Sequence, residues 1–176
     1  METPDQPELI RPAAFLLATT RNNAYEVAKA IGGQAPTTWA TAVFGPYQVA
    51  AYAQADDASE LVKFIEDLRQ SQNIWQLDAR ICKVIPGDEE LAPLETKRPE
   101  TAVLLINVDY KVELERIVTL NLRKLAGVAI ARAMWGPADI IAIVEADDRE
   151  AMRNLICDEV KVMKGVLSNS TLYCYP

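Results

Sequence analysis

Short apolar runs alternate with amphipathic stretches along the chain, and their order predicts strands and helices. Residues 13–20 form an apolar run that ends in two threonines and is followed by Asn22 and Asn23, as is typical of a short buried strand. Apolar residues then recur at helical spacing until Gly32 and Gly33, and glycine is a common stop at the end of a helix. The first two predicted elements are therefore a strand and a helix.

The following segment predicts a hairpin, a second helix and a closing strand. Residues 37–44 and 47–54 are rich in apolar, β-branched and aromatic residues, and Gly45-Pro46 separates them. Asp57-Ala-Ser-Glu60 has the spacing of a capping box, and an apolar stripe at helical spacing follows it. Residues 74–85 predict a strand, which completes the order βαββαβ.

The same pattern returns in the second half of the chain. Phe44-Gly45-Pro46 returns as Trp135-Gly136-Pro137, 91 residues further on, and Ala55-Asp56-Asp57 returns at the same displacement as Ala146-Asp147-Asp148. The second copy has predicted strands over 101–108, 128–135, 138–145 and 166–175, and predicted helices over 111–125 and from residue 148 onward. Two copies of so long a unit do not make a solenoid, so we expect two compact repeats.

The pattern divides the chain into a first repeat over 12–86, a linker over 87–100 and a second repeat over 101–176. The order βαββαβ is that of a ferredoxin-like α+β unit, in which both helices cover one face of an antiparallel sheet. The other face also needs cover, so we expect the two sheets to pack face to face as a pseudo-dimer. The residues expected on that face are Trp39, Val43, Ile141, Ile143 and Tyr173.

Several motifs of the second repeat resemble the effector-binding (RAM) domain of Lrp/AsnC-type transcriptional regulators. They are Gly136-Pro137-Ala138-Asp139-Ile140-Ile141, Val144-Glu145-Ala146-Asp147-Asp148, Gly165-Val166 and Ser170-Thr171. The first repeat shares Phe44-Gly45-Pro46-Tyr47, Ala55-Asp56-Asp57 and Ile74, but has Gln48 where the family has the aspartate. The resemblance implies a dimeric α/β barrel that binds a small effector, commonly an amino acid, near the glycine turn. Because the first predicted strand begins near residue 13, we expect no helix-turn-helix before it.

The resemblance points to six candidate ligand-binding residues at the two glycine turns, which are Gly45, Tyr47, Gln48, Gly136, Ala138 and Asp139. Glycine lets a ligand carboxylate approach backbone amides, although it also serves simply to reverse the chain. The Asp139 carboxylate is suited to pair with a ligand ammonium, or else to cap its turn. An amide cannot neutralise an ammonium, so Gln48 predicts that only the second repeat binds.

Composition limits the chemistry that the chain can perform. The 176 residues include no histidine, which excludes a His-activated nucleophile, a histidine-held haem and an imidazole zinc site. The pairs Asp56-Asp57 and Asp147-Asp148 precede helices and suit N-caps better than a divalent metal. We therefore expect no cofactor and no metal. We expect Cys82, Cys157 and Cys174 to be reduced thiols.

Charge and hydropathy indicate the compartment and the partners. The chain has 18 basic and 25 acidic residues, a net charge of −7 and no basic patch, so direct nucleic-acid binding is disfavoured. Its apolar runs are far shorter than the roughly 20 residues that span a bilayer. We expect a cytoplasmic protein without a membrane partner.

These features together predict a regulatory module that binds a small metabolite, such as an amino acid, without a DNA reader of its own. Its expected partners are further copies of itself and a DNA-binding regulator of the same family. One alternative is a cofactor-free oxidoreductase or monooxygenase of the dimeric α/β-barrel type, with Asn107, Tyr110 or Arg132 among the polar groups of its cavity. Another is a protein that only assembles, through exposed strand edges.

Overall fold

Two βαββαβ units follow one another in the computed structural model, which describes residues 10–109 and 113–175. The first contains β1 (Ala13–Thr20), α1 (Ala24–Gly32), β2 (Thr37–Phe44), β3 (Val49–Gln54), α2 (Ala58–Arg69) and β4 (Ile74–Ile81). The second contains β5 (Glu100–Val108), α3 (Leu114–Leu122), β6 (Val128–Ala133), β7 (Ile140–Ala146), α4 (Arg149–Asn154), a π-helical continuation η2 (Leu155–Val160) and β8 (Val166–Cys174). The 3-10 turn η1 (Asp88–Glu90) lies in the linker. The predicted order of strands and helices is confirmed.

Several predicted elements differ in extent from those observed. The strand expected over 74–85 ends at Ile81, and Cys82 forms an isolated bridge to Met134 of the other repeat. The helix expected over 111–125 is seen as α3 from Leu114, and residues 110–112 lie outside the described part of the chain.

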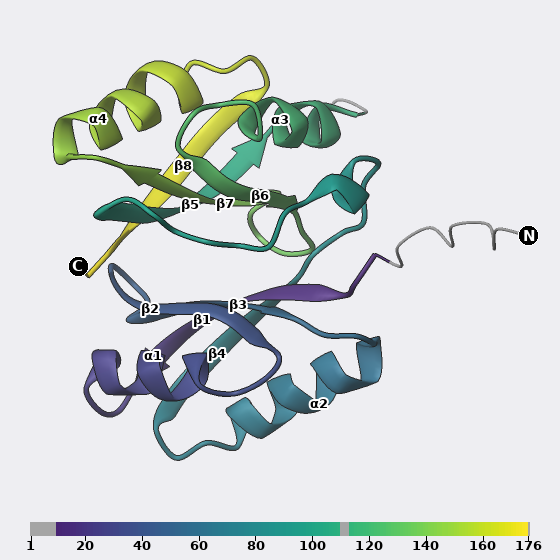
Figure 1. Ribbon diagram of the computed structural model, residues 1–176, viewed down its shortest axis with the longest axis vertical. Coiled ribbons are helices and arrows are strands. Elements are labelled where there is room, and N and C mark those ends of the chain that lie inside the picture. The colour runs from purple at the N-terminus through teal and green to yellow at the C-terminus, as the bar shows by residue number, and fades with distance from the viewer. Residues whose placement is uncertain (1–9, 110–112, 176) are drawn as a thin grey trace, which may run out of the picture.

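The helices of each repeat cover the outer face of that repeat's own strands. Figure 1 shows α3 and α4 on one side of the molecule, α1 and α2 on the other, and the two groups of strands between them. Each repeat can bury only one face of its strands with its own helices. The inner faces of the two repeats therefore cover each other.

All eight strands belong to one antiparallel sheet in the order β4-β1-β3-β2-β8-β5-β7-β6. The repeats join where β2 pairs with β8, through Val43↔Cys174 and Phe44↔Tyr173, at a junction that we call the β2–β8 seam. The outer strands meet at the β4–β6 seam, where Trp135 N donates to Ile81 O at 2.9 Å. The sheet thus closes on itself, and the predicted pseudo-dimer of the dimeric α/β-barrel type is confirmed.

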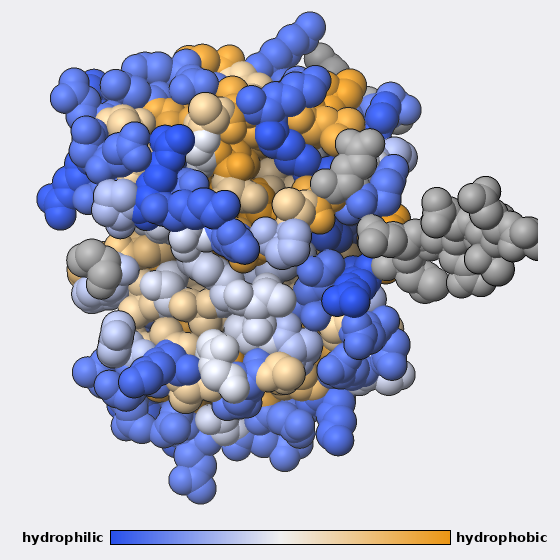
Figure 2. All heavy atoms as spheres, viewed as in Figure 1, coloured by the Kyte–Doolittle hydropathy of each residue, from blue (hydrophilic) through white to orange (hydrophobic). Residues whose placement is uncertain are grey.

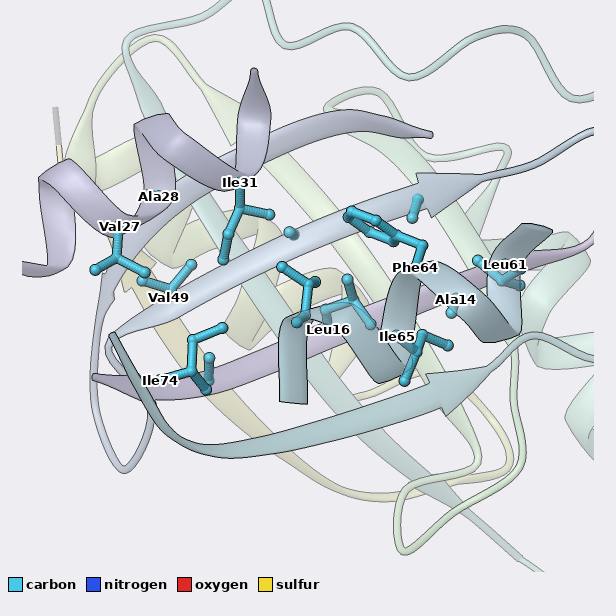
Figure 3. Packing of buried hydrophobic residues seen from close by; sticks show 14 of the residues in the cluster. Ala14, Leu16, Val27, Ala28, Ile31, Val49, Leu61, Phe64, Ile65 and Ile74 are labelled. Atoms are coloured by element: carbon cyan, nitrogen blue, oxygen red, sulfur yellow. The ribbon is translucent and has the colours of Figure 1, made fainter. Parts of the chain in front are cut away.

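Alternation along the strands separates two kinds of hydrophobic core. On β1, Leu16 faces the helices, whereas Phe15 and Leu17 face the other repeat. Figure 3 shows the helix-facing cluster of the first repeat, in which Leu16 lies among residues from α1, α2 and β4 such as Ile31 and Ile65. Burying one such large apolar side chain contributes about 1.5–3 kcal/mol, so these clusters hold the helices on the sheet.

The core between the repeats contains most of the residues expected there. Val43, Ile141 and Ile143 are buried in it, and Trp39 packs against it. Tyr173 is 47% exposed, so its placement in this core was wrong. Because side chains alternate along a strand, the neighbouring Leu172 of β8 takes the inward position instead.

The paired aspartates act as predicted at the helix N-termini. Asp57 accepts a hydrogen bond from Glu60 N at 2.9 Å, and Asp148 accepts one from Ala151 N at 2.8 Å. Within residues 10–109 and 113–175, no cluster of three or more acidic, cysteine or histidine side chains is arranged to hold a metal ion. No helix in the same ranges has the length and hydrophobicity needed to cross a membrane.

Candidate functional site

The two glycine turns lie where one repeat contacts the last strand of the other. Gly45 has φ +140°, and a Cβ atom there would lie 2.8 Å from the Leu172 side chain of β8. Gly136 has φ +148°, and a Cβ atom there would lie 3.5 Å from the Arg80 side chain of β4. Both glycines adopt backbone conformations that other residues rarely adopt, and both allow close packing across a seam.

Asp139 and Gln48 make the same hydrogen bond in the two repeats. Val108 N, at the end of β5, donates to Asp139 Oδ2 at 2.9 Å. Thr20 N, at the end of the equivalent β1, donates to Gln48 Oε1 at 2.7 Å. The bond needs only an oxygen acceptor, which glutamine and aspartate both supply. A ligand-binding role for these two side chains remains a prediction.

Tyr47 and Gly136 come together around one buried ion pair of the first repeat. Arg80, only 4% exposed, contacts Asp78 Oδ2 at 2.6 Å. The Tyr47 hydroxyl donates to the same oxygen at 2.9 Å, and burial together with this hydrogen bond raises the Tyr47 pKa. Ala138, two residues after Gly136, is buried, whereas Gly45 packs against Leu172 of β8. The six predicted residues are therefore distributed over both seams.

A pocket of about 520 Å³ opens at the β4–β6 seam, and we call it the seam pocket. The first repeat, the linker and β6 all contribute to its wall. Its lining residues are Ile10, Arg11, Gln54, Asp56, Asp88, Glu89, Leu91, Pro93 and Arg132. Figure 2 shows hydrophilic residues on the right of the view, where the two repeats meet. The volume lies within the usual range for small-molecule sites.

Two arginines share one buried carboxylate at the floor of the seam pocket. The Arg132 side chain is 2% exposed, and its Nη2 lies 3.3 Å from Asp88 Oδ2. Arg123 pairs with the other oxygen of Asp88, and Arg123 Nε also donates to Ala131 O at 2.9 Å. One carboxylate thus faces two guanidinium groups.

The remaining polar neighbours of Arg132 are neutral. Arg132 Nη1 donates to the Tyr52 hydroxyl at 3.3 Å across the space between the repeats. Burial raises the pKa of Tyr52, and burial raises the pKa of the Cys82 thiol to about 12. Both groups therefore keep their protons near neutral pH, and neither is suited to act as a base or a nucleophile there.

Sequence reasoning had singled out Arg132 only in the oxidoreductase alternative, and it had not singled out Asp88. The structure separates Arg132 from Asn107, whose amide donates to Ser168 Oγ at 3.1 Å. Tyr110 lies outside the described residues. A signal for Arg132 was present, because it occupies an inward position on β6 between Ile130 and Met134. An arginine is unusual at an inward-facing strand position whose neighbours on the same face are apolar.

A second pocket, of about 360 Å³, lies at the β2–β8 seam and differs in character. It is lined by Phe44, Pro99, Glu100, Arg149, Tyr173 and Cys174. The Phe44 ring stacks on Tyr175 at 3.8 Å between centroids. Glu100 and Arg149 form a rim pair at 3.8 Å in which the Arg149 side chain is 93% exposed. This pocket lacks a buried charge among its described lining residues.

The fold and the seam pocket define a duplicated ferredoxin-like protein of the dimeric α/β-barrel type. No protein-family profile and no curated protein matches the chain. Over nearly its whole length it is similar in structure to the siroheme decarboxylase NirDL, at 10% identity and TM-score 0.61, covering 94% of this chain and 71% of that one. It is likewise similar to chlorite dismutase from Candidatus Nitrospira defluvii, at 13% identity and TM-score 0.58, covering 96% and 92%.

AsnC of E. coli is a further similar structure, at 13% identity and TM-score 0.42, and the match covers 68% of this chain and 73% of that one. At these identities the full-length matches show the shared fold alone. The ferredoxin-like fold, the duplication and the barrel are thus established, and the regulatory role is a matter for proposal.

The seam pocket does not fit a haem-type iron as a resident cofactor. Such iron is held by histidine, cysteine thiolate, methionine or tyrosine. The chain has no histidine, and the described lining of the seam pocket includes none of the other three residue types. No chemistry of the pocket is derived through such a group.

Proposed function

We propose that this protein is a cytoplasmic regulatory module that binds a small metabolite, such as an amino acid, in the seam pocket. The observation that carries the proposal is a cavity of about 520 Å³ between the repeats with a buried arginine at its floor. Asp56 and Glu89 line the same cavity with carboxylates. A cationic floor together with acidic lining suits a ligand that carries both charges.

The chemistry of the floor favours binding over catalysis. A general acid or base works best when its pKa lies near the working pH. Tyr52 and Cys82 are held in their neutral forms by burial, and arginine stays cationic at all ordinary pH values. Of these three groups Arg132 lines the seam pocket, and we assign it the role of hydrogen-bond donor to a ligand. Further copies of the chain and a DNA-binding regulator of the same fold are the partners that this function requires.

A thermal-shift screen of the purified protein against amino acids and common metabolites, with light scattering to follow assembly, tests the proposal. A ligand that binds the folded state raises its melting temperature by mass action, so millimolar concentrations reveal weak binding. We expect at least one compound to raise the melting temperature and to change the size of the assembly. The absence of any such compound would contradict the proposal.

Three variants locate the site of any compound found. Leu91→Trp places a large ring in the wall of the seam pocket, and we expect it to lower affinity at least tenfold because the cavity is filled. Val84→Trp is the matched control, since Val84 also lies in the segment after β4 but is 60% exposed outside the pocket lining. Asp139→Asn keeps the acceptor for Val108 N, and we expect unchanged affinity. Loss of binding in Asp139→Asn with retention in Leu91→Trp would place the ligand at the glycine turn.

A further inference from the structure

The Arg132 guanidinium has fewer partners than its depth of burial calls for. It carries five N–H donors. Among residues 10–109 and 113–175, it makes one hydrogen bond to Tyr52 and one ion-pair contact to Asp88, and its buried Nε–H has no hydrogen-bond partner. Leaving a buried charged donor unsatisfied is costly, so the site calls for an additional acceptor.

Buried Arg80 and the partly buried Arg123 differ from Arg132 at this atom. Arg80 Nε donates to Asp78 Oδ2 at 3.1 Å, and Arg123 Nε donates to Ala131 O at 2.9 Å. The Nε–H groups of Arg80 and Arg123 are therefore both hydrogen-bonded within the protein. Arg132 is the one of the three that both lines the seam pocket and keeps its Nε–H unused.

We propose that Arg132 is the anchor for a ligand carboxylate, which accepts a hydrogen bond from its Nε–H. This rests on the function proposed for the seam pocket and adds the chemical group that the pocket recognises. A hydrogen bond from a charged donor to a carboxylate is roughly twice as strong as one between neutral groups. Nη2, the nitrogen on the same edge as Nε, already faces Asp88, and Nη1 donates to Tyr52, so among the described contacts Nε–H is the donor available to a ligand.

The lining also limits the charge of the ligand. Asp56 and Glu89 bring two further carboxylates to the wall of the same pocket, and Arg11 pairs with Asp56 at 3.4 Å. Like charges repel, so a phosphate dianion fits this lining less well than a monocarboxylate. Asp88 is a positioning residue in this arrangement, because it pairs with Nη2 of Arg132 and so fixes the guanidinium beside the pocket.

The test compares ligands that differ at the carboxylate or at the ammonium group. L-Leucine, L-leucinamide and 4-methylpentanoate are titrated by calorimetry, together with the corresponding sets for methionine and phenylalanine. We expect each carboxylate to bind at least tenfold more tightly than its amide, as the loss of a charge-assisted hydrogen bond predicts. A carboxylate-to-amide ratio near one would overturn the inference while leaving the proposed binding function standing.

Two variants assign the effect to Arg132. Arg132→Lys keeps a cation beside Asp88 but removes the Nε–H, and it is expected to lower carboxylate affinity about tenfold or more while amide affinity stays the same. Arg80→Lys is the matched control, since Arg80 is equally buried on the neighbouring strand and does not line the pocket. It is expected to lower stability without changing the carboxylate-to-amide ratio. An equal change in that ratio for both variants would overturn the inference.

A direct spectroscopic readout separates anchoring from a purely structural role. The Arg132 Nε–H signal in a nitrogen-proton NMR spectrum is assigned by its absence in Arg132→Lys. We expect L-leucine to shift this signal and L-leucinamide to leave it in place. If both compounds bind and neither moves it, Arg132 is not the anchor. If no probe binds at all, the proposed function fails, and this inference fails with it.

Discussion

The β4–β6 seam and the β2–β8 seam are built from equivalent segments of the two repeats but carry different chemistry. Arg132 of β6 stands where β2 has Thr41, and Arg80 of β4 stands where β8 has Leu172. Tyr52 of β3, the hydrogen-bond partner of Arg132, corresponds to Ile143 of β7. The β4–β6 seam thus gathers buried charges, whereas the β2–β8 seam gathers aromatic rings and an exposed ion pair.

Features that the two seams share are requirements of the fold. The glycine at each turn packs against the other repeat, and an acceptor oxygen follows each turn to bond the end of the first strand of its repeat. Features present at one end only are not needed to close the barrel. The glycines, Gln48 and Asp139 thus have a structural role at both seams, whereas Arg132 and Asp88 form a buried ion pair at one seam only.

The largest expected difference between the ends is the cost of removing one carboxylate from each. Asp88→Asn leaves two buried guanidinium groups without an anion, and we expect it to lower the free energy of unfolding by about 3–5 kcal/mol. Glu100→Gln at the other end breaks a solvated pair and is expected to cost at most about 1 kcal/mol. Urea unfolding of both variants measures the contrast. Equal losses would mean that the charged seam is no more important to stability than the rim.

The equivalent cysteines Cys82 and Cys174 are expected to give the two seams the same loss of stability at high pH. Burial raises the pKa of both Cys82 and Cys174 from 9.0 to about 12. A pKa that is higher in the folded state gives stability that is complete below pH 9 and is lost as the pH rises toward 12. We expect wild-type stability relative to Cys82→Ala or Cys174→Ala to fall by about 1.4 kcal/mol per pH unit above 9.

Unfolding free energies of the wild type and each alanine variant at pH 8, 10 and 11 measure this loss. Comparison with each variant removes the contribution of lysines and tyrosines that titrate in the same range. A difference that stays constant with pH would show that the thiols ionise as freely in the folded protein as in the unfolded chain.

The smallest effect distinguishes the two glycine turns. Alanine at either position strains a positive φ, at a cost of about 1–3 kcal/mol. Gly45→Ala should cost about 1 kcal/mol more than Gly136→Ala, because its Cβ would overlap Leu172 at 2.8 Å while the other meets Arg80 at 3.5 Å. Thermal unfolding of both variants measures the difference. Adding Leu172→Ala should restore part of the loss in Gly45→Ala only, and equal behaviour in both backgrounds would refute the overlap.

Local patterns were sufficient to predict the architecture. The displaced Phe44-Gly45-Pro46 motif predicted the duplication, and the aspartates before α2 and α4 predicted the helix caps that are observed. Both signals lie within a few residues of their consequence. Tyr173 was assigned to the wrong face because a strand shifted by one residue exchanges its faces, and composition does not fix that phase.

The candidate site could not be predicted in the same way. Asp88 lies in a proline-rich, charged segment that resembles an ordinary linker, and its pairing with Arg132 joins residues that meet only when the barrel closes. Gln48 at the aspartate position predicts that the first repeat lacks a ligand contact, and this stays a prediction. The structure adds that both positions accept one equivalent backbone hydrogen bond, which requires only an acceptor oxygen.

The covalent connection between the repeats has a consequence for concentration. Two separate subunits that form such a barrel part on dilution, and any substitution in them appears at both ends. Here the connection from β4 to β5 keeps the halves at a fixed and high effective concentration, so dilution does not open the barrel. It also lets the sequence of each seam change independently, so that one seam can have an arginine at the position where the other has a threonine.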